Sequence, residues 1–82
     1  MHLEIITPDK KVFEGEVSEA TFPGAEGSFQ VLKNHAAIIS ALVKGAVSYI
    51  STEDGPKSLI VDGGVVEVND NNIIVLAEKV ID

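Results

Sequence analysis

The sequence predicts an all-β fold, a small antiparallel β-sandwich of short strands, and three observations support this prediction. Short runs rich in β-branched residues recur at even spacing, and clusters of Gly, Pro, Asn and Asp separate them. No segment keeps a helical period of apolar residues. The chain has 82 residues, of which 45% are hydrophobic, so we expect residues 1–82 to form a single β-sandwich domain with a thin core.

The expected strands are short, and turn sequences set their limits. They cover residues 3–6, 11–14, 16–22, 28–31, 38–43, 46–51, 58–61, 65–68 and 73–77. The turn sequences are Thr7-Pro8-Asp9, Lys44-Gly45, Glu53-Asp54-Gly55-Pro56, Gly63-Gly64 and Asn69-Asp70-Asn71-Asn72. Gly15 predicts a β-bulge, and the change of alternation between Val17 and Ala20 predicts a second one.

The charge of the chain excludes several classes of partner. The net charge is −7, and the six basic residues are lysines spread along the chain, whereas a nucleic-acid surface needs a basic patch. An anionic membrane surface is disfavoured for the same reason. The longest apolar run, residues 36–43, is too short to span a bilayer, so we expect no direct membrane insertion. The absence of cysteine is consistent with a reducing compartment.

Residues that could carry chemistry are few. His35 lies between a turn and a predicted strand, where a lone histidine more often caps the turn through a backbone carbonyl than takes part in catalysis. His2 is expected in a frayed terminus. Residues 24–27 precede a strand rather than a helix, and residues 69–72 lack the spacing of a calcium loop. We therefore expect no catalytic, cofactor-binding or metal-binding residues and a protein that is not an enzyme.

Several predicted strands carry apolar residues in both phases of the alternation. The pairs are Ile5 and Ile6, Val12 and Phe13, Ile38 and Ile39, and Val65 and Val66. Each sheet of a small sandwich has one inner face, so one member of such a pair is expected to point outward. An exposed apolar patch usually marks a partner surface; the alternative is that edge strands and closure of the sheet hide these residues.

A polar loop bounded by Gly24 and Gly27 precedes the most apolar run of the chain. Constrained loops on a rigid core commonly carry the function of small domains. This segment resembles the conserved loop of the epsilon subunit of bacterial F-type ATP synthases, with Gln30 in place of the family's third glycine and Ala37 in place of its proline. The matching residues are Gly24, Gly27, Val31, Leu32, His35, Ala36, Ile38 and Ile39.

Three further segments resemble the same family in the same order. They are Leu3-Glu4-Ile5-Ile6-Thr7-Pro8, Val12-Phe13-Glu14-Gly15-Glu16-Val17 and Asp62-Gly63-Gly64-Val65-Val66-Glu67-Val68. The resemblance covers nearly the whole chain and implies the N-terminal β-sandwich domain of an epsilon subunit. Many members continue into a C-terminal helical hairpin that inhibits ATP hydrolysis. We expect this hairpin to be absent, because the chain ends soon after the last predicted strand.

The resemblance also implies a role and two partners. An epsilon subunit belongs to the rotor in the central stalk and helps couple proton- or sodium-driven rotation to ATP synthesis. It binds the gamma subunit and the c-ring of the membrane sector, at the cytoplasmic face of the bacterial inner membrane, as a peripheral protein without a cofactor. The residues that match the c-ring interface loop are Gly24, Glu26, Gly27, Ser28 and Gln30. The residues expected to face gamma are Phe13, His35, Ile39 and Val65.

Two other kinds of protein remain as alternatives. A lipoyl- or biotinyl-like carrier domain is also all-β, acidic and of this length, but it needs a lysine at an exposed hairpin tip between acidic residues or methionines, and Lys33 and Lys57 lack these neighbours. A small ligand-binding β module, such as a sugar-binding one, would use aromatic side chains for stacking, and the chain has one Tyr and no Trp.

Overall fold

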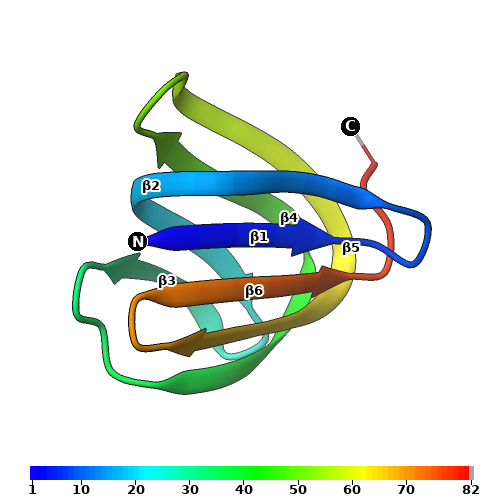
Figure 1. The fold of residues 1–82 in the computed structure, drawn as a ribbon. Helices are drawn as coiled ribbons and strands as arrows, with labels where there is room; N and C mark the ends of the chain where they lie inside the picture. The colour runs from blue at the N-terminus through cyan, green and yellow to red at the C-terminus, as the bar shows by residue number, and fades with distance from the viewer. Residues whose placement is uncertain (82) are drawn as a thin grey trace.

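Six β-strands make up most of the computed structural model, which describes residues 1–81 (Figure 1). In chain order they are β1 (His2–Ile6), β2 (Lys11–Gly24), β3 (Gly27–Leu32), β4 (Ile38–Ser51), β5 (Gly55–Asn69) and β6 (Asn72–Ala77). Residues 1–81 contain no helix, and the predicted all-β fold is confirmed. No membrane-crossing helix is therefore found in the described part of the chain.

The sheet closes on itself through β1. The strand order is β1-β6-β5-β4-β2-β3, and β1 also pairs with β2, so β1 lies between β2 and β6 (Figure 1). All pairs are antiparallel, as predicted, except β1 and β6, which run parallel. The parallel pair was not expected because the two strands lie at opposite ends of the sequence and no hairpin joins them.

Three strands are long because each bends and takes part in two layers. The first half of β4 pairs with the second half of β5, which in turn pairs with β6, whereas the second half of β4 lies between β2 and the first half of β5. The prediction that the chain turns at Lys44-Gly45 is wrong, since β4 continues through this pair. Gly63-Gly64, predicted to make a tight bend, lies within β5, and its two φ angles are positive at 86° and 143°. Close packing explains Gly45, where a Cβ atom would lie 2.8 Å from the Cβ of Pro23.

β2 joins two of the predicted strands into one. Its register against β4 shifts between Val17 and Glu19, so Val17 and Ala20 both face the core, as the change of alternation predicted. The prediction of a bulge at Gly15 is wrong, because the pairing of β2 with β1 is regular at Gly15. The register of this pair shifts only between Phe13 and Lys11.

The buried apolar residues form one cluster: Leu3, Ile5, Val17, Ala20, Phe22, Val31, Leu42, Val47, Tyr49, Val61, Val66, Val68, Ile73, Val75 and Ala77.

Two hairpins follow the turn chemistry of the sequence, and both predicted turns are confirmed. Asp70 and Asn71 have φ angles of 52° and 62° between β5 and β6, as the central residues of a type I′ turn require. Between β4 and β5, Gly55 has a φ of 80°. The hydroxyl of the buried Ser51 accepts a hydrogen bond of 3.1 Å from the backbone N–H of Asp54 in this second turn.

We expect Gly64→Ala to destabilise the domain by at least about 2 kcal/mol, because a Cβ at this position would lie 2.3 Å from the carbonyl oxygen of Leu76 and φ is 143°. Gly55→Ala is the control, since a Cβ at Gly55 meets nothing within 4 Å and only the positive φ is costly, at about 1 kcal/mol. Urea unfolding of both variants measures the difference. Equal losses would contradict the close approach of β5 and β6.

Candidate functional site

The outer surface of one layer is apolar. We call this surface the outer apolar face, and its members are Ile6, Ile39, Ala41, Val65, Ile74 and Leu76. One row crosses four strands, because Ala41 pairs with Val65, Val65 with Leu76 and Leu76 with Ile6. The exposed fractions are 74% for Ile39, 53% for Leu76 and 41% for Val65. Large exposed apolar side chains in one contiguous patch are typical of a surface that binds a partner.

The alternation of β-strands explains this face. In β5 and β6 the residues next to the exposed ones are fully buried, as at Val66 beside Val65 and at Val75 between Ile74 and Leu76. The expectation that one member of an apolar pair points outward therefore holds for Val65 and Val66. It fails for Val12 and Phe13, which are both half-buried against the core.

The four residues expected to face gamma do not lie together. Ile39 and Val65 share the outer apolar face, on neighbouring strands. Phe13 pairs with the buried Ile5 and packs on the ring of Tyr49, with 4.6 Å between the ring centroids, so it is part of the core packing. His35 lies in the loop between β3 and β4, outside this face.

His35 makes two hydrogen bonds within its own loop. Its backbone N–H donates to the carbonyl of Leu32 at 3.0 Å, and its Nδ1 lies 2.7 Å from the carbonyl oxygen of Ala36, close enough to donate to it. Beside it, Asn34 has a φ of 67° and its backbone N–H donates to the side chain of Asn71 at 2.7 Å. The loop is therefore tied to the β5–β6 hairpin, and the histidine has the structural role that a lone loop histidine usually has.

The residues expected to face the c-ring form the tip of the hairpin between β2 and β3. Gly24 pairs with Gly27, and two residues connect them. Gly24 is buried, and a Cβ there would lie 2.6 Å from the carbonyl oxygen of Gly27 and 2.9 Å from the ring of Phe29. Gly27 has a φ of 129°. Glu26, Ser28 and Gln30 are exposed, so the tip is a rigid and polar projection.

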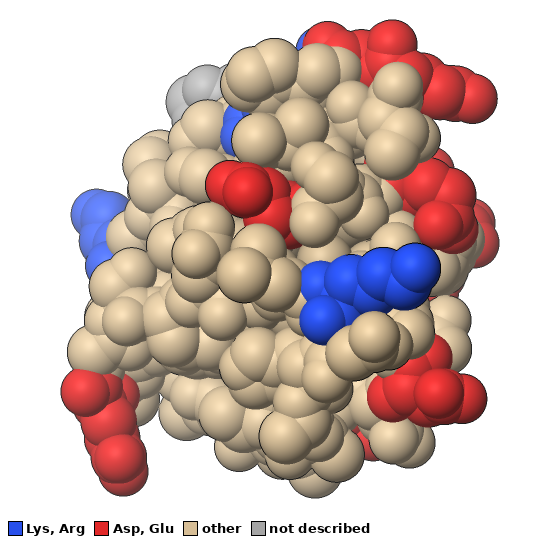
Figure 2. Space-filling view, turned by 90° about the vertical axis from the view of Figure 1, so that its left-hand side faces the viewer, with Lys and Arg blue, Asp and Glu red and all other residues tan. Residues whose placement is uncertain are grey.

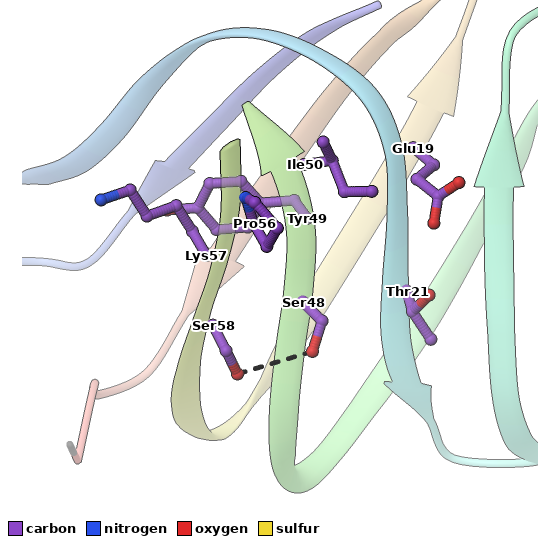
Figure 3. Close-up of a pocket in the computed structure, with 8 residues that line it drawn as sticks. All are labelled: Glu19, Thr21, Ser48, Tyr49, Ile50, Pro56, Lys57 and Ser58. Carbon is purple, nitrogen blue, oxygen red and sulfur yellow. Dashed lines mark hydrogen bonds between the residues drawn. The ribbon is translucent and has the colours of Figure 1, made fainter. Parts of the chain in front are cut away.

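A shallow pocket lies on the outer side of the other layer (Figure 3). Thr21, Ser48 and Ser58 form a row across three strands, with 3.5 Å between the two serine hydroxyl oxygens. Glu19 and Lys57 also line the pocket, and no histidine or cysteine is among its lining residues. The groups needed to activate a nucleophile are not assembled there.

Charged side chains gather where β1 meets β2. The ring nitrogens of His2 lie 3.2 Å from a carboxylate oxygen of Glu16 and 3.1 Å from one of Glu14. The prediction that His2 frays is wrong, because it pairs with both β2 and β6. His2, Glu4 and Glu14 lie close enough to approach one metal ion. However, the Lys11 ammonium lies 2.6 Å from Glu14 and 3.1 Å from Glu4 and forms ion pairs with both carboxylates, so the cluster is an ion-pair network.

Charges elsewhere are dispersed. On the face shown in Figure 2 the lysines stand apart from one another, acidic side chains are concentrated along one side, and much of the surface is uncharged. This distribution gives that face no basic patch of the kind that binds nucleic acid.

Comparison with known proteins identifies the family. The model of the family described as "ATP synthase, Delta/Epsilon chain, beta-sandwich domain" matches residues 1–82. The chain belongs to this family. The ATP synthase epsilon chain of Chlorobium limicola is 40% identical over 78 residues, which cover 95% of this chain and 89% of the relative. That of a Nitratiruptor species is 42% identical, and the match covers 95% of this chain but 60% of the relative.

Solved structures agree with the family assignment at the level of the fold. A chain in the central stalk and c-ring structure of the Tetrahymena thermophila mitochondrial ATP synthase superposes with a TM-score of 0.84 at 24% identity, covering all of this chain and 66% of that one. A chain of the Euglena gracilis mitochondrial ATP synthase gives 0.87 at 21% identity, covering 96% of this chain and 51% of that one. Epsilon chains are non-catalytic stalk subunits of a membrane-associated complex.

The His2 network makes stability depend on pH. Hydrogen bonds to Glu16 and then Glu14 raise the pKa of His2 above its usual 6.5. The stabilisation is therefore fully present below pH 6.5 and is lost as pH rises through the raised pKa. We expect the free energy of unfolding to fall as the pH rises above 6.5, and His2→Gln to flatten this slope. An unchanged slope in His2→Gln, measured by urea unfolding across this range, would contradict the role of the network.

Proposed function

We propose that this domain is a rotor subunit in the central stalk of a bacterial F-type ATP synthase, at the cytoplasmic face of the inner membrane. It binds the gamma subunit through the outer apolar face and the c-ring through the hairpin tip, and so helps couple ion-driven rotation to ATP synthesis. Catalysis belongs to other subunits. The observation that supports this proposal most strongly is the exposure of Ile39, Val65 and Leu76 side by side on one sheet face.

The outer apolar face suits a permanent protein partner such as gamma. Burial of apolar surface stabilises a complex by roughly 25 cal/mol per Å², and the paired strands of the sheet fix the shape of this face before binding. In the next row of this face, Glu67 lies between Ile39 and Ile74 and is exposed. Glu4 belongs to the same row but already forms an ion pair with Lys11. Acidic groups within an apolar surface favour a partner that supplies basic residues, which adds orientation to the contact.

The hairpin tip suits a partner with polar loops, such as the c-ring. The backbone of the tip is held by the pairing of Gly24 with Gly27 and by the hydrogen bond from the Ala25 N–H to the carbonyl of Ala41, so little conformational entropy is lost when it binds. Neither alternative function gains support from a specific feature. Lys57 lies within β5 rather than at a hairpin tip, and Tyr49 is buried against Phe13 and cannot stack on a ligand.

We expect Ile39→Asp and Val65→Asp each to weaken binding to gamma at least about tenfold and to lower the domain's stability by only about 1 kcal/mol, since both side chains are exposed. Val66→Asp is the matched control, because it buries a charge in the core and costs several kcal/mol. Calorimetric titration with gamma and urea unfolding measure the two effects. If Ile39→Asp and Val65→Asp fail to fold, these residues are core residues and the proposed gamma surface is wrong.

We expect a single cysteine introduced as Ser28→Cys to crosslink to a cysteine in a polar loop of the c-ring in the assembled enzyme. The chain has no cysteine of its own, so the crosslink is specific to the exposed tip. Ser58→Cys, exposed on β5, is the control and is expected to remain unlinked. Electrophoresis under non-reducing conditions detects the product. Absence of the Ser28 crosslink in a fully assembled complex would refute the assignment of the tip.

A further inference from the structure

One side of the sandwich remains open. β1 closes the sheet by pairing with β2 and β6, whereas β3 pairs with β2 alone. Residues 38–41 of β4 likewise pair only with β5, because the pairing of β4 with β2 begins at Leu42. At one end of this opening the backbone N–H of Ala25 donates to the carbonyl of Ala41 at 2.9 Å. Two strand edges with unused backbone groups therefore border the same side of the molecule.

A groove of about 460 Å³ lies between these two edges. One wall is formed by residues 25–29 and the other by residues 38–41. Phe29 and Ile38 are half-buried against the core and present apolar surface to the groove, and Glu26 is the one charged residue that lines it. Ile39 also lines it, so the groove is continuous with the outer apolar face.

The other free edge of this layer, in the first half of β5, differs from β3. It contains Pro56 and Lys57, residues that commonly prevent edge strands from pairing. Further along, residues 79–81 cover it: Val80 forms a bridge with Val61, and the backbone N–H of Ile81 donates to the carbonyl of Ile60 at 2.8 Å. β3, with the sequence Gly-Ser-Phe-Gln-Val-Leu, has neither a proline nor a charge. Its edge is therefore suited to accept another strand.

We propose that an extended segment of the gamma subunit enters this groove and pairs with the free edge of β3 as an added strand. The inference rests on the proposed function and specifies how part of gamma is bound. Alternate side chains of the added strand point to the same side, so apolar residues of the segment cover Phe29 and Ile38. A basic residue near one end of the segment complements Glu26. The segment continues from the contact that gamma makes at Ile39.

Hydrogen exchange of backbone amides, followed by NMR with and without gamma, tests this mode of binding. In an antiparallel strand about half of the amides point to each side, so about half of the amides of residues 27–32 should exchange at least about tenfold more slowly in the complex. The amides of residues 55–59, on the protected edge of β5, should not change. Binding of gamma by calorimetry without protection of β3 overturns the inference and leaves the proposed function standing. No binding of gamma overturns both.

A matched pair of substitutions tests the groove independently. Ser40 and Ser48 are both half-buried serines of β4; Ser40 lines the groove, and Ser48 lines the pocket on the outer side of the other layer. We expect Ser40→Trp to fill the groove and weaken the affinity for gamma at least about tenfold, and Ser48→Trp to leave the affinity unchanged. Circular dichroism and urea unfolding verify that both variants fold. Equal affinity of folded Ser40→Trp and the unmodified chain would overturn the proposed strand addition.

Discussion

The double pairing of β1 is the interaction on which the rest of the structure depends. Leu3 and Ile5 have no exposed surface, and the backbone that carries them pairs with β2 on one side and with β6 on the other. A chain of this length buries a thin core, so its stability depends on covering that core from every side. The pairing of β1 with β2 and β6 covers the core on one side. On the other side, β3 and the start of β4 each keep a free edge where another chain can pair.

The core and the outer apolar face are made by the same strands. In β6 the buried Ile73 and Val75 are each followed by an exposed apolar residue, and in β5 the exposed Val65 precedes the buried Val66. Val66 and Val75 therefore stabilise the domain while Val65 and Leu76 lie in the outer apolar face. An apolar side chain on an outer sheet face contributes little to the isolated domain, and its burial free energy is released only when a second protein covers it. The alternation of the strands thus separates folding from binding within a few residues.

The polar hairpin tip between β2 and β3 has a different structural requirement from the apolar face. A hairpin tip that meets a partner through polar groups needs a fixed shape, and the pairing of Gly24 with Gly27 and the hydrogen bond between Ala25 and Ala41 provide it. At the other end of β3, hydrogen bonds between Asn34 and Asn71 hold the loop that leads to β4. The groove is lined by residues of the tip and by Ile39 of the outer apolar face, so the three features are continuous.

Local signals in the sequence determined the fold class, the two hairpin turns, the shift of face between Val17 and Ala20, and the outward direction of Val65, since each depends on backbone angles or alternation within a few residues. The family assignment likewise followed from short segments in order. The tertiary structure alone decided the parallel pairing of β1 with β6, the inward position of Phe13 and the continuity of β4 through Gly45. These features depend on contacts between residues far apart in the chain, such as Gly45 against Pro23. Such contacts cannot be predicted from a pattern of a few neighbouring residues.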